Sequence, residues 1–235
     1  MTAADSVSVV IPVWNEAGRV SRLLDALEAC RPAPLETIVV DGGSTDGTTG
    51  KVRGRARLVT ALRGRARQQN AGARAARGEA LWFLHADSVP GPGAVGEIAA
   101  ALEEGSPGGC FFIAFPADEL RRHALLPLIQ RGINARTRAA RTGTGDQGIF
   151  IRRELFECLG SFPEWPLFED VALFRAIRSA GRPALCQGPL ETSARRWLAH
   201  GVMRTMARMW GLRIGFAMGM PPDRLARAWV QSPEG

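Results

Sequence analysis

The sequence contains no tyrosine and only one lysine, Lys51, among its 30 basic residues, so the other 29 are arginines. With 23 acidic residues, the formal net charge is +7. This skew is typical either of a compositional bias of a whole proteome or of a protein that attracts anions, such as a nucleotide diphosphate, an anionic acceptor or a membrane surface. We find no basic run interleaved with aromatic residues and no nucleic-acid-binding motif, which argues against a nucleic-acid partner.

Cysteine is scarce, and its spacing excludes the common zinc and redox motifs. No two of the four cysteines are close enough for a CxxC pattern, and we expect buried thiols of a cytosolic protein at Cys30, Cys110, Cys158 and Cys186. No apolar run approaches the roughly 20 residues that a membrane span needs. Because a strand pattern begins almost at the first residue, we expect no signal peptide. The predicted location is cytoplasmic, with at most peripheral attachment at the inner face of the membrane.

The length of 235 residues and the 46% hydrophobic content fit one globular domain. Only Gln231 to Gly235 reads as disordered. Apolar and β-branched runs predict strands over 7–13, 37–40, 57–60, 80–85, 110–115, 147–151 and 183–186. Helical spacing predicts helices over 17–30, 66–77, 91–104, 119–141 with a break near Pro127, 170–180 and 196–218. This alternation predicts an α/β fold with a mostly parallel central sheet flanked by helices.

Polar residues follow three of the predicted strands. Asn15 and Glu16 follow the first strand, Asp41 ends the second and Asp87 follows the fourth. In open α/β sheets, ligands bind beyond the carboxyl ends of the strands. We therefore expect one composite site at this edge of the sheet. The alternative is that each residue caps a helix, and that alternative applies equally to Ser44, Thr45 and Asp46.

Several motifs occur in a specific order. The segments "VVIPVWNE" and "IVVDGGSTDGT" are followed by "GRARQQNAGARAARGEALWFLHADS", "GDQGIFIRRELFECLGSFP", "FEDVALFRAIRSAG" and "ETSARRW". Together they resemble the family 2 glycosyltransferases, and most closely the small bacterial subgroup of transferases associated with radical-SAM and selenium-domain proteins. The resemblance implies a single GT-A domain over 1–235. Within it we expect a nucleotide-binding half (1–90), an acceptor-side half (91–200) and a C-terminal helical segment (201–235).

The resemblance assigns a donor pocket. Asp41 matches the aspartate that hydrogen-bonds the nucleotide base, and Pro12 and Glu16 line the same pocket. Trp14 either stacks on the base or belongs to the core, and Pro12 is otherwise a simple strand terminator. The segment from Arg65 through Gln68 to Asn70 approaches the donor in the family. An arginine there would meet the nucleotide or its phosphates, or else lie on a solvated helix face. The expected donor is linked to UDP or GDP.

The resemblance also implies a divalent cation, Mn²⁺ or Mg²⁺. Asp87 matches the last acid of the family's DxD signature, which reads His85-Ala86-Asp87 here. One carboxylate and two donor phosphates can hold such an ion, because hard cations prefer oxygen ligands. His85 replaces an acid that in the family contacts ribose. His85 therefore has three possible roles, which are to contact the ribose, to support the metal ligands or to bind the metal itself.

The remaining motifs are expected on the sugar and acceptor side. In the family, Asp146 and Gln147 lie there. Glu169 and Asp170 form an acidic pair at a helix start, and the second residue corresponds to the catalytic base of an inverting transfer. Negative charge also favours a helix N-terminus, which is the alternative for both. Late in the chain, we expect closure over the diphosphate by Arg195, Arg196 and Trp197.

Two further points stay open. The apolar stretch from Thr205 to Met220, with interspersed arginines, predicts a helix that packs on the domain, contacts a second copy in a homodimer or lies in a membrane interface. Rival functions are a sugar-1-phosphate nucleotidyltransferase and a non-catalytic nucleotide-sugar-binding module. The first is disfavoured because "PVWNEAGR" contains one glycine and no lysine. A dinucleotide-dependent oxidoreductase is excluded because no GxGxxG follows the first strand.

Overall fold

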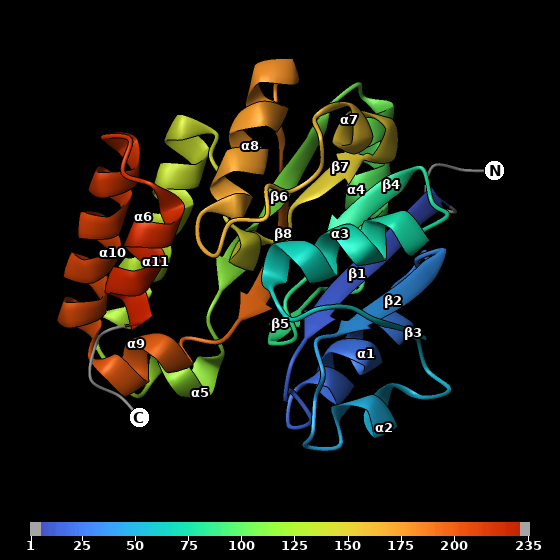
Figure 1. Ribbon diagram of the computed structural model, residues 1–235, viewed down its shortest axis with the longest axis horizontal. Helices are drawn as coiled ribbons and strands as arrows, with labels where there is room; N and C mark the ends of the chain where they lie inside the picture. Colours follow the sequence, from blue (N-terminus) through green and yellow to red (C-terminus); the bar gives the residue numbers. More distant parts are fainter. Residues whose placement is uncertain (1–5, 231–235) are drawn as a thin grey trace.

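A computed structural model describes residues 6–230, with the side chains of residues 196, 200, 229 and 230 left out. Its centre is a sheet of eight strands in the order β3-β2-β1-β4-β7-β6-β8-β5 (Figure 1). The strands are β1 (Val7–Val13), β2 (Glu36–Asp41), β3 (Arg57–Thr60), β4 (Ala80–Phe83), β5 (Ser88–Val89), β6 (Gly108–Ala114), β7 (Phe150–Arg152) and β8 (Ala184–Thr192). The prediction of a mostly parallel α/β sheet is confirmed.

The first half of the sheet is a parallel block. β1 pairs in parallel with both β2 and β4, and β2 pairs in parallel with β3. Alternate side chains of β1 enter opposite cores, so Val9 and Ile11 pack on one face and Val10 on the other. The β-branched run is buried on both faces, as expected for a central parallel strand.

Helices cover both faces of this sheet. One face carries α1 (Val20–Glu28), α2 (Thr48–Val52) and α4 (Ala94–Glu103), and the other carries α3 (Arg65–Ala75), α7 (Arg153–Cys158) and α8 (Glu169–Ala180). A Cβ atom at Gly72 would lie 2.3 Å from Cγ1 of Val10, so only glycine allows α3 to approach β1 this closely.

The second half mixes directions and departs further from the sequence prediction. β7 runs antiparallel to β4 and β6, whereas β6 and β8 are parallel. β8 extends six residues beyond the expected end at Cys186, through an irregularity in its pairing with β6. Strand β5 and helix α7 were not predicted. The segment expected as a strand from Gln147 begins as a 3-10 helix, η2 (Gly145–Gln147), because Thr144 and Gln147 form a capping box.

The remaining helices form a layer beside the sheet, at the left and lower left of Figure 1. They are α5 (Ala117–Leu120), α6 (Leu126–Ala140), α9 (Arg195–His200), α10 (Val202–Ala217) and α11 (Pro222–Val230). The predicted break near Pro127 is confirmed, since this proline lies in the first turn of α6. The single helix expected over 196–218 is two helices, separated at Gly201 with a φ of 79°.

Three expectations concern the chain as a whole. Cys30, Cys110 and Cys186 are buried as expected, but the prediction was wrong for Cys158, which is exposed at the last residue of α7. The segment from Gln231 to Gly235 lies outside the described residues. Among residues 6–230, no helix combines the length and the apolar character that crossing a bilayer requires.

Candidate active site at the carboxyl edge of the sheet

The loops after β1 and β2 are tied to each other by hydrogen bonds. The backbone N–H of Asn15 donates to Ser44 Oγ at 2.9 Å, and the backbone N–H of Thr45 donates to Asn15 Oδ1 at 2.9 Å. Asn15 has a φ of 53°, which asparagine tolerates better than most residues. These loops therefore form one prearranged unit, and the capping alternative for Ser44 and Thr45 is replaced by a role in joining the two loops.

Asp46 does take the expected position at a helix start. Its Oδ1 accepts the N–H of Thr48, the first residue of α2, at 3.0 Å, and its Oδ2 accepts the N–H of Ala17 at 3.0 Å. The hydrogen bond from the Thr48 hydroxyl contributes most to lowering the pKa of this exposed carboxyl. Asp46 thus closes the same pair of loops from the outer side.

Asp41 lies at the carboxyl end of β2 and is only 5% exposed. Its carboxylate accepts the backbone N–H groups of Gly43 and Ser44 at 3.0 Å. Both N–H groups bond to Oδ2, so the side chain holds its own loop. Oδ1 accepts a longer bond from Ser44 at 3.2 Å and retains a lone pair for a ligand. Pro12 lies on the same edge, one residue before the end of β1 and half-buried.

Two amides of α3 that were expected near the donor are used within the fold. Gln68 Nε2 donates to the carbonyls of both Val13 and Val40 at 2.8 Å, which joins the ends of β1 and β2. Asn70 Nδ2 donates to the Phe162 carbonyl at 2.9 Å, and its Oδ1 accepts the Phe162 N–H at 3.0 Å. Both polar atoms of the buried Asn70 amide therefore have partners within the fold, which favours a structural role over the expected donor contact.

Trp14 projects from the loop after β1 and is 41% exposed, so it does not belong to the core. The Arg63 guanidinium lies 3.3 Å from the centroid of its ring, a cation–π contact. One face of the indole is thus already covered by an arginine.

Two carboxylates and two arginines meet next to these loops. Arg195 Nη2 lies 3.5 Å from Glu16 Oε1 and 3.5 Å from Asp87 Oδ2, while Arg19 Nη1 lies 2.8 Å from Glu16 Oε2. Burial raises the pKa of Asp87, and repulsion from Glu16 raises it further. The attraction of Arg195 acts in the opposite direction. The structure thus brings together three residues predicted from distant motifs, at the ends of β1 and β4 and at the start of α9.

His85, Gly145 and Asp170 converge a short distance further along the edge. The Gly145 N–H donates to Asp170 Oδ2 at 2.7 Å. A Cβ atom at Gly145 would lie 2.9 Å from His85 Nε2 and 3.3 Å from Asp170 Oδ2. The glycine therefore keeps an imidazole and a carboxylate close to one backbone amide. The other Asp170 oxygen accepts the N–H of Val171 at 2.8 Å in the first turn of α8.

Glu169 has a different environment from its neighbour. It is 1% exposed, and its Oε1 lies 3.2 Å from Arg65 Nη1. Burial raises the pKa of Glu169, the attraction of Arg65 opposes this, and Asp170 adds repulsion. The side chain of Arg65 is half-exposed, so it can also face the cleft. The acidic pair is therefore divided between a buried ion pair and a carboxylate near the glycine amide.

The "TGDQG" segment also divides its two polar residues. Gln147 is fully buried, and its Nε2 donates to the Phe111 carbonyl at 3.1 Å and to Thr137 Oγ1 at 3.0 Å. These bonds favour a structural role for Gln147 over its predicted place on the acceptor side. Asp146 is half-buried and accepts the Thr144 hydroxyl.

Sequence reasoning missed two arginines on this side. Burial lowers the pKa of Arg136 on α6, and repulsion from Arg213 on α10 adds to this, against the attraction of Asp146. Arg136 therefore lies near both Arg213 and Asp146. No local pattern identified them, because the arginines are spread along the whole chain.

The predicted group at the start of α9 is only partly at the site. Arg195 contacts Glu16 and Asp87, as described above. Trp197 packs on the apolar cluster that contains Ile113, Phe115 and Leu126, which favours a packing role over the expected closure over a diphosphate. The side chain of Arg196 lies outside the described part of the chain.

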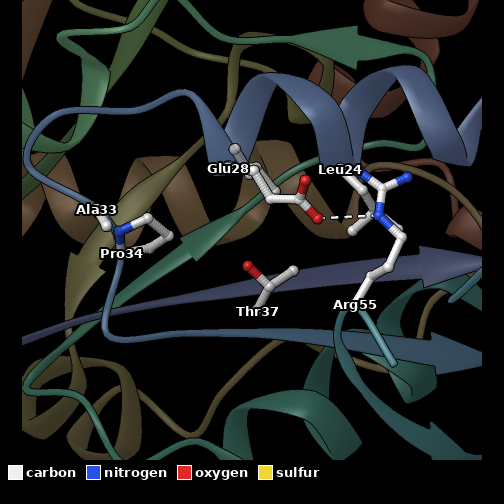
Figure 2. A pocket seen from close by; sticks show the side chains of 7 residues that line it. Leu24, Glu28, Ala33, Pro34, Thr37 and Arg55 are labelled. Carbon is white, nitrogen blue, oxygen red and sulfur yellow. Dashed lines mark hydrogen bonds and ion pairs between the residues drawn. The ribbon is translucent and has the colours of Figure 1, made fainter. Parts of the chain in front are cut away.

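A hollow elsewhere in the molecule does not coincide with this site. It lies between α1 and the start of β2, at the opposite edge of the sheet from Asp41, and Arg55 reaches across it to Glu28 (Figure 2). Its lining residues are Leu24, Leu27, Glu28, Ala33, Pro34, Thr37 and Arg55. It shares no residue with the acids and amides above, and we assign it no role.

The family model described as glycosyl transferase family 2 matches residues 8–160 of this chain. Uncharacterized glycosyltransferases from two strains of Mycobacterium tuberculosis are 33% identical over 114 residues, which cover 46% of this chain and 44% of theirs. The match thus spans less than half the length of these curated relatives.

Solved structures share the fold. TarS of S. aureus in complex with UDP aligns with a TM-score of 0.60 and 22% identity over 80% of this chain and 60% of that chain. Glucosyl-3-phosphoglycerate synthase of M. tuberculosis with Mn²⁺, UDP and phosphoglyceric acid aligns with a TM-score of 0.61 and 21% identity, over 93% of this chain and 81% of that chain. The GT-A type of fold is confirmed, and, on the family match over residues 8–160, the chain belongs to glycosyl transferase family 2.

Proposed function

We propose that this protein transfers a sugar from a nucleoside-diphosphate sugar to an acceptor hydroxyl, with inversion at the anomeric carbon. The observation that carries the proposal is the convergence of Asp41, Glu16, Asp87, His85 and Asp170 along one edge of the sheet, where such sheets bind ligands. Structures of the same fold hold UDP or GDP-mannose, which supports a UDP- or GDP-linked donor.

In this proposal the donor side is the hydrogen-bonded unit after β1 and β2. Asp41 accepts N–H groups of the base, and Glu16 and Pro12 line the pocket. Trp14 offers its free face for stacking. Arg195 is half-exposed and bonded only to carboxylates, so it can turn to the diphosphate oxygens. His85 lies between the donor side and Asp170 and is suited to a ribose or sugar contact.

The family resemblance implies a Mg²⁺ or Mn²⁺ ion, and the donor set fits it. Asp87 and Glu16 both face the guanidinium of Arg195, so this position already accommodates positive charge. Among residues 6–230, however, no three acidic, histidine or cysteine side chains are grouped for a metal. Asp87 would therefore hold an ion that takes its other ligands from phosphate oxygens and water. When bound, the ion offsets negative charge on the departing diphosphate.

Asp170 is the proposed catalytic base. An acceptor hydroxyl attacks well only if its proton leaves as the new bond forms. One Asp170 oxygen would take that proton, the hydroxyl oxygen would bond to the anomeric carbon, and the bond to the diphosphate would break on the opposite face. The Gly145 N–H fixes the carboxylate in place. Glu169 is held by Arg65 in a buried pair, so we assign it a positioning role.

On the proposed acceptor side, Asp146 attracts Arg136, and Arg213 is the second cationic group near Arg136. An acceptor that itself carries negative charge would suit these arginines. The division into a nucleotide-binding half (1–90) and an acceptor-side half (91–200) remains part of this proposal.

A thermal-shift panel of UDP, GDP, UDP-sugars and GDP-sugars, each with and without Mn²⁺, tests the proposal. A ligand that binds only the folded state raises the free energy of unfolding, by about 2.7 kcal/mol when its concentration is a hundred times Kd. The melting temperature Tm rises as a result. We expect one nucleotide series to raise Tm, with a larger rise when Mn²⁺ is present. Asp87→Asn should remove the metal-dependent part alone. If no nucleotide shifts Tm under any condition, the donor assignment fails.

A further inference from the structure

Charge is distributed very unevenly between the two parts of this molecule. We define the basic helical layer as residues 121–141 and 195–230, which include α6, α9, α10 and α11 and leave out α5. It contains 13 arginines and a single acidic residue, Asp223, so its net charge is +12. The remaining 17 basic and 22 acidic residues give −5. The excess positive charge of the whole chain therefore lies in this layer.

The same layer carries most of the exposed large apolar side chains. Six of the ten in the described residues lie there, namely Leu128, Met203, Trp210, Ile214, Met218 and Met220. Met203, Trp210 and Ile214 are 62%, 59% and 55% exposed. Together with exposed Ala207 and Ala217 they recur every three or four residues, so they form one stripe along α10. We call this stripe the α10 apolar face.

The opposite side of α10 accounts for its packing. Leu212 and Phe216 lie with Phe168 and Leu225 in a separate apolar cluster, and the Phe168 and Phe216 rings stack at 4.7 Å. The helix is thus firmly seated on one side and leaves an apolar stripe uncovered on the other. α10 and α11 lie side by side in Figure 1, and Arg208 of α10 donates to the Ala228 carbonyl of α11 at 2.9 Å.

Arginines flank the α10 apolar face. Arg204 follows Met203 beside this face and is exposed, and α11 adds exposed Arg224 and Arg227 to the same basic helical layer. A long arginine side chain can lay its methylenes along an apolar surface while its guanidinium reaches phosphate groups. A tryptophan in the middle of the stripe suits the boundary between water and lipid.

From these observations we propose that the α10 apolar face docks on an anionic lipid bilayer, with α10 lying parallel to its surface. The proposal is independent of the glycosyl transfer proposed above. A bilayer suits both features at once, since its acyl region takes the apolar stripe and its charged head groups take the arginines. A second copy of this chain fits less well, because a twofold contact would oppose two surfaces of the same strong positive charge.

The docking surface also bears on the active site. Phe168 has a φ of 67° and immediately precedes the pair Glu169 and Asp170. Because Phe216 stacks on Phe168, the helix that would rest on lipid also supports the segment that presents the proposed base. Bilayer contact would therefore hold this segment close to the membrane surface.

The test is flotation of the full chain with vesicles of neutral phosphatidylcholine, and with vesicles that also contain about 30% phosphatidylglycerol. We expect binding to the anionic vesicles, weakened by raising the salt concentration, since each basic residue near such a surface contributes about fivefold in affinity. Ile214→Glu and Arg204→Glu should each lower the partition coefficient about tenfold or more. Leu62→Glu and Arg53→Glu, at exposed positions in the other part of the molecule, are the matched controls.

All four positions are exposed, so circular dichroism and Tm should confirm that each variant is folded. Equal binding to neutral and anionic vesicles, or equal losses for the controls, would overturn the proposal. It would also be overturned if the protein ignored vesicles and instead formed a dimer that Ile214→Glu dissociates in sedimentation experiments. Nucleotide-dependent thermal shifts that survive in Ile214→Glu would separate this outcome from failure of the proposed function.

Discussion

The two ends of the proposed cleft are held together by different kinds of contact. On the donor side, two loops are joined by hydrogen bonds between backbone N–H groups and uncharged side chains, as between Asn15 and both Ser44 and Thr45. Outside these loops, charged groups face each other, as in Arg65 with Glu169 on the catalytic side and Arg195 with Asp87 at the expected position of the diphosphate. Hydrogen bonds to backbone fix a shape, whereas ion pairs can exchange one charged partner for another. The difference suggests a rigid donor pocket beside a cleft whose arginines change partners when phosphates arrive.

The sharpest test of this division is Asp170→Asn. The change keeps size and hydrogen bonding to the Gly145 amide but removes basicity. We expect kcat to fall about 10²–10⁴-fold, as for loss of a general base, while donor Kd stays nearly constant. Steady-state kinetics and calorimetry measure the two quantities, with donor hydrolysis as the readout until an acceptor is known.

Glu169→Gln is the matched variant. If Glu169 only positions the segment through Arg65, its loss should lower kcat less than Asp170→Asn does. A larger effect at Glu169 would reassign the base, and an anomer retained in the product would reject the inverting mechanism.

The donor pocket is tested by Asp41→Ala. We expect weaker binding of the free nucleotide by about 1–3 kcal/mol, because a buried base N–H loses its acceptor. Asp41 also holds its own loop through Gly43 and Ser44, so a loop effect needs its own control. Asp46→Ala disturbs the same pair of loops without touching the base. Equal losses in the two variants, measured by calorimetry, would leave Asp41 with a structural role alone.

Asn70→Leu separates folding from function on the same helix. The substitution leaves the buried N–H and carbonyl of Phe162 without their partner, which should cost about 1–3 kcal/mol of unfolding free energy. Urea unfolding measures this, and Gln187→Leu, at an exposed position, should cost much less. Nucleotide affinity per folded molecule should hardly change. A large loss of affinity in a stable Asn70→Leu protein would return this residue to the donor site.

The elements most securely predicted from sequence are those whose signal is local. The β-branched run of β1 and the polar residues at the ends of β1, β2 and β4 follow from periodicity and from the geometry of parallel sheets. The partners of Asn70 and Arg65 could not be predicted, since Phe162 and Glu169 are 92 and 104 residues away. An amide or an arginine in a polar helix looks the same whether it meets a ligand or a distant backbone group. The short β5 and the irregular β8 carry too few residues of regular pattern to be recognised.

The last prediction concerns the pH dependence of stability and the buried carboxyl of Glu169. Burial raises the pKa of this group above its unfolded value. The attraction of Arg65 lowers the pKa by less than burial raises it, so the pKa remains raised. A folded state with the raised pKa binds a proton more readily than the unfolded chain does. The contribution of Glu169 to unfolding free energy is therefore favourable at low pH and is lost as pH rises from the unfolded pKa through the folded one.

Glu169→Gln imitates the protonated form at every pH. The difference in unfolding free energy between this variant and the wild type should therefore change as pH rises above about 4.5, with the wild type gaining relative stability on acidification. Urea unfolding at several pH values measures the difference, and Glu164→Gln, whose exposed side chain pairs with Arg67, should show little change. If the wild type instead loses relative stability on acidification, attraction by Arg65 outweighs burial. The ion pair would then be a net stabilising contact, and the catalytic side of the cleft would be as rigid as the donor side.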